Sequence, residues 1–241
     1  MRHKTGKRGI AWALQDNSDS PDIFLNGKIS WLYNWSPKKT DAGNLEFVPT
    51  FWNGKDVGQF PEGAKVLLGF NEPDHDGQAT MSPVDAAKIW KEHIAPLANK
   101  GVRLGSPSVT GSDQGLNWLA SFFEELNKLG DPKVDFLNLH WYGKGVDNFI
   151  AYLEKARARF GSKHSVWVTE FACTTFSGST PQEEVDEFLT QSIQKLDSID
   201  WVERYAWFGA MKNLPDNVGN ENSLIGQDGQ LSELGKKYVH G

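Results

Sequence analysis

Eight short apolar runs recur along the chain at regular intervals. Each run is rich in β-branched and aromatic residues, which favour strands over helices when a run is only four to eight residues long. The predicted strands lie at residues 9–14, 29–35, 46–52, 66–71, 102–109, 136–142, 166–171 and 203–208.

Helical periodicity appears between the later strands. Residues 82–100 begin with Ser82 as N-cap and Pro83 at the first helical position, and they stop before Gly101. Thr180 and Glu183 have the spacing of a capping box. The predicted helices cover residues 82–100, 116–129, 146–160 and 180–197, and a short terminal helix follows residue 229. By contrast, the connections 15–28, 36–45 and 53–65 show no helical stripe.

Strands that alternate with helices imply parallel strands, and eight such units imply a closed (β/α)8 TIM barrel of the α/β class. We expect a compact barrel with short or missing helices in its first half. An open, doubly wound sheet is the alternative, but it requires a glycine-rich loop after the first strand, and residues 9–19 have none. Because no linker divides the sequence, residues 1–241 are predicted to form a single domain.

Composition narrows the class of partner. The net charge of -6 argues against nucleic acid and against an anionic membrane surface. No apolar run reaches the roughly 20 residues of a membrane span. The ten tryptophans suit a sugar-binding cleft, because sugars stack on indole faces. A single cysteine, Cys173, leaves no cysteine-based metal cluster and is interpreted as a buried small side chain.

Candidate chemistry lies where the predicted strands end, the active face of such a barrel. The fourth strand ends in Asn71 and Glu72, and the seventh ends in Glu170. Strand alternation places Glu72 on the side of Leu68 and Phe70, and Glu170 on the side of Val166 and Val168.

The sixth strand carries its own polar set. His140 and Tyr142 share a side with Asn138, while Trp141 faces the other way. Both glutamates and the His140/Tyr142 pair are therefore predicted to converge on one site.

Two glutamates at strand ends suit retaining glycoside hydrolysis. One protonates the departing oxygen and the other attacks the anomeric carbon, and in the retaining geometry the two carboxyl groups lie about 5 to 5.5 Å apart. We expect Glu170 to be ionised and Glu72 to begin protonated.

Five motifs on successive strands resemble glycoside hydrolase family 128 of clan A, a family of endo-β-1,3-glucanases on a compact barrel. They are KRGIAW at 7–12, LGFNEPD at 68–74, LGSPSV at 104–109, LHWYG at 139–143 and VTEFAC at 168–173. The resemblance implies a retaining mechanism with Glu72 as acid/base and Glu170 as nucleophile. It further implies that Asn71 binds the sugar 2-hydroxyl, that His140 and Tyr142 lie beside the nucleophile, and that Trp207 forms a floor under the sugar.

Further expectations concern contacts and context. We expect Asn34, Trp35 and Trp141 to contact substrate, although Asn34 suits a structural role equally, and Trp141 faces outward by alternation. No cofactor or metal is expected, because Asp74, His75 and Asp76 read as a polar loop. The expected partner is β-1,3-glucan, and the protein is expected to be a secreted monomer. Two alternatives stay open: another clan A enzyme, such as a β-1,4-mannanase or cellulase, and a non-catalytic β-glucan-binding protein.

Overall fold

The computed structural model describes residues 6–13, 20–41 and 43–241. All eight predicted strands occur, although Leu14 at the end of the first one and part of the connection after it lie outside the described residues. The strands are β1 (Arg8–Trp12), β2 (Trp31–Tyr33), β3 (Glu46–Phe47), β4 (Val66–Leu67), β5 (Arg103–Leu104), β6 (Phe136–Gly143), β7 (Ser165–Cys173) and β8 (Val202–Ala210).

The strands follow the order of a barrel, with every ladder parallel. One sheet runs β3-β2-β1-β8-β7-β6, and β4 pairs with β5 separately. Single parallel bridges, such as Thr50 to Leu68 and Gly105 to Phe136, join the two sheets. The predicted α/β barrel architecture is therefore confirmed, but its ring of ladders is not continuous as a closed (β/α)8 barrel would have it.

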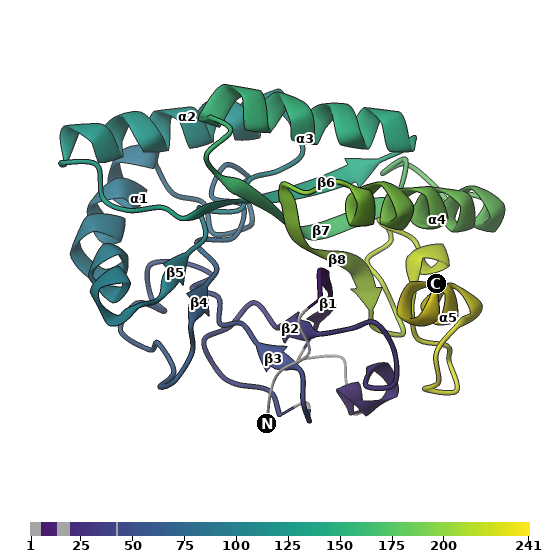
Figure 1. The fold of residues 1–241 in the computed structure, drawn as a ribbon. Coiled ribbons are helices and arrows are strands. Elements are labelled where there is room, and N and C mark those ends of the chain that lie inside the picture. The colour runs from purple at the N-terminus through teal and green to yellow at the C-terminus, as the bar shows by residue number, and fades with distance from the viewer. Residues whose placement is uncertain (1–5, 14–19, 42) are drawn as a thin grey trace.

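The longer helices cover the second half of the barrel. Figure 1 shows α1 to α4 around the strands, whereas the described parts of the connections that follow β1, β2 and β3 hold no α-helix. The C-terminal helix packs against β1, where the Tyr238 hydroxyl donates to the carbonyl of Gly9 at 2.7 Å. The described part of the connection from β1 to β2 holds only one short 3-10 helix, η1 (Pro21–Phe24). The α-helices are α1 (Pro83–Ile89), α2 (Asp113–Lys128), α3 (Val146–Phe160), α4 (Gln182–Ser198) and α5 (Glu233–His240), and a further 3-10 turn is η4 (Asn220–Asn222).

Two helix predictions need correction. The expected helix 82–100 is broken into α1, a π-helical segment η2 (Trp90–Ile94) and a 3-10 segment η3 (Ala95–Lys100). Pro96 explains the break, because it lacks an N–H and its ring displaces the preceding turn. The capping box is also wrong: Pro181 is the N-cap of α4, and the buried Thr180 hydroxyl has no hydrogen bond.

Large aromatic side chains fill the lower barrel interior. The Trp167 ring stacks on Phe136 at 4.5 Å and lies 5.2 Å from Trp31, between centroids. The guanidinium of Arg204 lies 4.6 Å from the centroid of Trp167. This packing closes the barrel from below, so only its upper, carboxyl end remains for a ligand.

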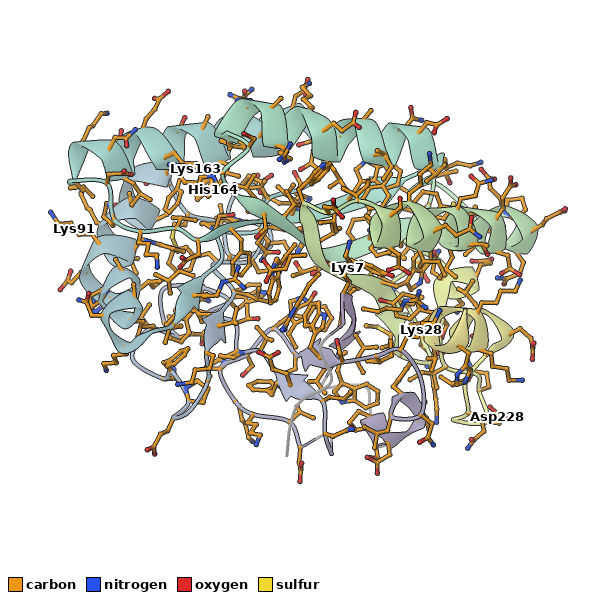
Figure 2. The ribbon with its side chains drawn as sticks, viewed as in Figure 1. Lys7, Lys28, Lys91, Lys163, His164 and Asp228 are labelled. Carbon is orange, nitrogen blue, oxygen red and sulfur yellow. The ribbon has the colours of Figure 1, made fainter. Side chains whose placement is uncertain are left out.

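The first strand is tied to the helical layer by Lys7, labelled in Figure 2. Its ammonium donates to the carbonyls of Leu196, Asp197 and Ile199 at 3.0, 3.1 and 2.8 Å. A cation at these orphan carbonyls stabilises the C-terminus of α4. Among the described residues, the helices are too short or too polar to cross a bilayer.

A bulge in β7 changes the direction of its side chains. Leu139 of β6 pairs with Val168, but the next residue, His140, pairs with Glu170, so Thr169 is an extra residue in β7. The register against β8 shifts at the same place. A bulge lets two successive side chains share a face. Val168 accordingly packs into the outer core, whereas Thr169 and Glu170 both point inward.

Candidate active site

A cleft of about 970 Å³ opens at the carboxyl ends of the strands. Both predicted glutamates, Glu72 and Glu170, line it. Three of the four non-glycine residues with positive φ among the described residues also line it: Trp35, Glu72 and Phe176, at φ 55°, 43° and 61°. Side chains rarely adopt this left-handed conformation unless the surrounding structure fixes it, and such strain gathers at functional sites.

Glu72 reaches the cleft from an irregular segment rather than from a regular strand. The ladder of β4 ends at Leu67, and the N–H of Glu72 donates to the carbonyl of Ser108 at 2.7 Å. The two segments lie this close because Gly69 has no side chain: a Cβ there would lie 2.8 Å from the backbone of Ser106. The alternation predicted for this strand is therefore wrong, since Phe70 packs outward against Trp90.

Glu170 is held at both of its oxygens. The Tyr142 hydroxyl donates to Oε2 at 2.6 Å, and the Trp35 indole donates from Nε1 to Oε1 at 2.7 Å. The Tyr33 hydroxyl lies 3.5 Å from Oε1 and donates to the Thr169 carbonyl at 2.9 Å. Donors at both oxygens favour the carboxylate form. The bulge, and not the predicted alternation with Val168, brings Glu170 to this position.

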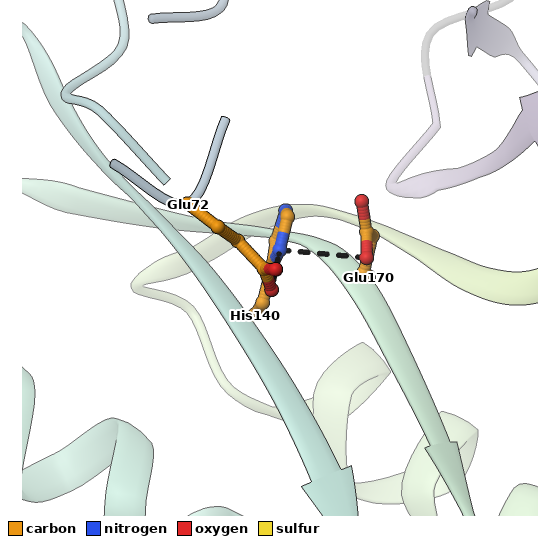
Figure 3. Close-up of side chains that lie close together, drawn as sticks. All are labelled: Glu72, His140 and Glu170. Carbon is orange, nitrogen blue, oxygen red and sulfur yellow. Dashed lines mark hydrogen bonds and ion pairs between the residues drawn. The ribbon is translucent and has the colours of Figure 1, made fainter. Parts of the chain in front are cut away.

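His140 lies between the two carboxyl groups, as Figure 3 shows. Its Nδ1 is 2.9 Å from Glu72 Oε1 and 3.4 Å from Glu170 Oε2. One oxygen of each glutamate and a ring nitrogen of His140 all lie within 4.8 Å of one another. The two carboxyl groups thus have the close spacing of a retaining glycosidase and leave no room for the water that an inverting enzyme places between them.

The pKa directions of both glutamates differ from the prediction. Burial raises the pKa of Glu72, but the hydrogen bond and charge of His140 outweigh it, and the net shift is downward. Burial and the charge of Glu72 raise the pKa of Glu170 against the lowering effects of His140, Tyr142 and Trp35. The pKa of His140 is raised, because the carboxylates of Glu170 and Glu72 outweigh its burial. Both shifts favour a proton on His140 over the one expected on Glu72.

The same three residues form a group with the spacing of metal ligands. Nδ1 of His140 already bonds Glu72, and both oxygens of Glu170 accept hydrogen bonds from protein donors. We therefore assign no metal to the group. In the loop after Glu72, the side chain of Asp74 instead accepts from the backbone and hydroxyl of Thr110.

Four of the other predicted residues lie in or directly beneath the cleft. Trp35, Asn71 and Tyr142 line it, and the Asn71 amide donates to Gln78 at 3.3 Å. His140 is 1% exposed and lies beneath the two glutamates rather than in the cleft wall.

Asn34 does not reach the cleft. Its amide donates to the carbonyl of Lys38 and to the hydroxyl of Thr40, both at 2.8 Å, while its oxygen accepts from the N–H of Ser36. A short amide that bonds its own loop in this way stabilises a turn. The substrate-contact prediction for Asn34 is wrong, and the structural alternative describes it.

Two tryptophans predicted to contact substrate belong to the outer core. Trp141 stacks 5.5 Å from Phe188 of α4 and lies 5.0 Å from Phe149 of α3. Trp207 is fully buried, and its indole donates to the carbonyl of Asn222 at 2.8 Å. Both face the helices because they sit on the outward side of their strands, so Trp207 is not a floor under the sugar.

Trp52, another tryptophan at the end of a predicted strand, also lines the cleft, whereas the prediction missed Phe208 and Phe176. Alternation along β8 could have identified Phe208, because Arg204 and Ala206 point inward and Phe208 follows with the same spacing. Phe176 gave no signal, since it lies in a loop after β7.

A parallel barrel whose strand ends bring two hydrogen-bonded glutamates into one cleft defines the glycoside hydrolase class. The chain belongs to the glycosyl hydrolase catalytic core family, whose model matches residues 9–238. It is 35% identical over 246 residues to alkali-sensitive linkage protein 1 of Schizosaccharomyces pombe. That match covers 98% of this chain but only 44% of the relative, so the chain spans less than half of that protein.

Solved structures of family 128 confirm the resemblance predicted from the motifs. An exo-β-1,3-glucanase of subgroup VI from Aureobasidium namibiae has a TM-score of 0.86 and 29% identity, covering 100% of this chain and 98% of that one. A curdlan-specific exo-β-1,3-glucanase of subgroup III from Blastomyces gilchristii, in complex with glucose, has a TM-score of 0.80 and 35% identity, and the match covers 97% of each chain. An endo-β-1,3-glucanase of subgroup I from Amycolatopsis mediterranei, in complex with laminaritriose, has a TM-score of 0.78 and 30% identity. That match covers 96% of this chain and 98% of the other.

Proposed function

We propose that this chain hydrolyses β-1,3-glucans with retention of configuration. The observation that carries the proposal is the Glu72 and Glu170 pair, whose nearest oxygens lie within 4.8 Å at the floor of the cleft. The β-1,3-glucanase activity of the similar solved structures supports the substrate class.

In the proposed mechanism, Glu170 attacks the anomeric carbon while Glu72 protonates the departing glycosidic oxygen. Glu72 then removes a proton from the water that hydrolyses the glycosyl ester. Trp35 and Tyr142 orient the nucleophile, and Asn71 binds the sugar 2-hydroxyl. Phe208 and Trp52 offer aromatic faces to the sugar rings.

Covalent trapping tests the mechanism. The enzyme is incubated with 2-deoxy-2-fluoro-β-laminaribiosyl fluoride, and the labelled peptide is identified by mass spectrometry. We expect an adduct on Glu170 in the native chain and none in Glu170→Gln. A chain that binds laminari-oligosaccharides but forms no adduct would instead be a non-catalytic glucan-binding protein.

The substrate is tested by reducing-sugar release from laminarin, curdlan, carboxymethylcellulose and mannan. Activity confined to the β-1,4 polymers would identify a mannanase or cellulase and contradict the proposal. Endo action stays a prediction, and the length of the first products from laminarin decides it. Secretion and a monomeric state are proposed on the same footing, to be tested by recovery from the medium and by light scattering.

A further inference from the structure

A buried chain of hydrogen bonds leads from His140 away from the cleft. Its Nε2 is 3.0 Å from the Thr169 hydroxyl oxygen, and that hydroxyl donates to Asn138 Oδ1 at 2.7 Å. Asn138, His140 and Thr169 are each 1% exposed. The three side chains are therefore shielded from solvent, and the chain of hydrogen bonds runs through them to Glu72 at its upper end.

The direction of the protons follows from the chemistry of the donors. An amide oxygen only accepts, so the single proton of the Thr169 hydroxyl is committed to Asn138. The hydroxyl oxygen therefore presents a lone pair to His140, and Nε2 must carry a hydrogen. In the neutral imidazole, Nδ1 is then bare, and it faces Glu72 Oε1 at 2.9 Å.

We propose that Asn138 and Thr169 are positioning residues that fix the protonation pattern of His140, so that one mobile proton is shared between its Nδ1 and Glu72. The proposal rests on the acid/base role proposed for Glu72. This proton lies in the 2.9 Å contact between Nδ1 and Glu72 Oε1. When substrate binds, it moves to Glu72 and then to the glycosidic oxygen, which keeps the electron pair of the broken bond to the anomeric carbon. The Glu170 carboxylate forms the new bond to that carbon, and the imidazole is left neutral with its hydrogen on Nε2.

The surrounding charges agree with this storage of a proton. The charges of Glu170, Glu72 and Asp74 act to raise the pKa of His140, whereas those of His140 and His75 act to lower the pKa of Glu72. Burial lowers the pKa of His140, but the carboxylates more than offset it, and its pKa is raised. The pair is thus one titrating unit, and its proton belongs to neither residue alone.

Thr169→Val tests the proposal, because valine keeps the shape of threonine and removes the hydroxyl. The Nε2 hydrogen then has no acceptor, and the imidazole shifts to the form with its hydrogen on Nδ1, which leaves Glu72 ionised. We expect hydrolysis of laminaritriose to fall about 10- to 100-fold, less than the loss of the general acid itself, which contributes about 10²–10⁴-fold. The basic limb of the pH profile should move to lower pH. Cleavage of 2,4-dinitrophenyl β-laminaribioside, whose leaving group needs no proton, should change less than about threefold.

Thr169→Ser is the matched control and should retain activity on both substrates. Asn138→Leu removes the acceptor at the end of the chain and should reproduce the effect of Thr169→Val, which keeps the test available if the valine variant does not fold. Equal losses on both substrates, or no loss on either, would overturn the proposal.

Nitrogen-15 NMR of labelled histidine separates the proposal from the glucanase assignment. At high pH we expect the His140 hydrogen on Nε2 in the native chain and on Nδ1 in Thr169→Val, whatever the substrate proves to be. An Nε2 without hydrogen in the native chain would refute the proposed direction of the protons.

Discussion

The indole of Trp35 donates a hydrogen bond of 2.7 Å to Glu170, although 135 positions in the sequence separate the two residues. Trp35 makes this bond from a left-handed backbone at φ 55°, a conformation that costs about 1–3 kcal/mol. Its ring is held between Tyr33 and Phe208, at 5.0 and 5.9 Å between centroids. The packing of the barrel therefore maintains the strain that places this donor.

Trp35→Phe should impair the nucleophile without emptying the cleft. The donor stabilises the charged form of Glu170, so its loss raises the pKa of that carboxyl, and the acid limb of the kcat/KM profile moves to higher pH. We expect kcat to fall about 100-fold, as for other donors that stabilise charge in an active site. Trp52→Phe, which also changes a cleft tryptophan, is the control and should leave the acid limb in place. An unshifted limb in Trp35→Phe would show that the hydrogen bond does not tune Glu170.

Loss of the proposed acid should depend on the leaving group. Glu72→Ala should slow hydrolysis of laminari-oligosaccharides by about 10²–10⁴-fold, because their alkoxide must be protonated as it leaves. With a dinitrophenyl leaving group, formation of the glycosyl ester should stay fast, and added azide should yield the β-glycosyl azide. Glu170→Ala should abolish both reactions. An azide product of the α configuration would contradict retention.

Neighbouring aromatic residues on β8 should give opposite phenotypes. Phe208 lines the cleft, so Phe208→Ala should raise KM for laminaritriose about tenfold, equal to about 1.4 kcal/mol, with little change in Tm. Trp207 is fully buried, so Trp207→Ala should lower the free energy of unfolding by about 3–5 kcal/mol. Kinetics and thermal unfolding of the two variants check this. A selective KM effect in the Trp207 variant would restore it as a substrate contact.

The lower end of the barrel should limit stability in acid. Burial alone raises the pKa of Glu203, but hydrogen bonds from Arg103 and Ser165 lower it to about 2. A lowered pKa in the folded state contributes stability above the unfolded value near 4.3, and this contribution is lost as the pH falls toward about 2. Glu203→Gln should therefore lower Tm at pH 7, and the difference from the native chain should shrink between about pH 4.5 and pH 2. A constant difference over that range would contradict the assignment.

Prediction from sequence succeeded where a pattern reports regular structure. Eight apolar runs gave eight strands, and the alternation along β6 correctly placed His140 and Tyr142 opposite Trp141. It failed where the backbone is irregular. Glu72 follows a two-residue ladder and adopts a positive φ, and Glu170 follows a bulge, so both face the cleft for reasons that a two-residue period cannot show.

Side-chain hydrogen bonds between strands could not be predicted from the sequence for another reason. Trp35 bonds Glu170 across the mouth of the barrel, because β2 and β7 are separated in the sheet by β1 and β8. Thr169 bonds Asn138 between the neighbouring strands β7 and β6, but it points inward only because of the bulge, which no sequence pattern shows. The pKa direction predicted for Glu72 was wrong for the same reason. His140 lowers that pKa because its Nδ1 lies 2.9 Å from Glu72 Oε1, a contact that the sequence does not show.

The extra residue in β7 gives this active site an evolutionary vulnerability. Because two successive side chains share the inner face, Thr169 contacts His140 while Glu170 lines the cleft. Deletion of one codon at this point would straighten the strand and lower the carboxylate by about 3.3 Å toward the aromatic packing of the barrel interior. Every residue type of the cleft wall would survive, and the barrel could still hold sugar. Descendants of such an enzyme could therefore lose catalysis through a change in length alone, with no substitution in the motif to reveal it.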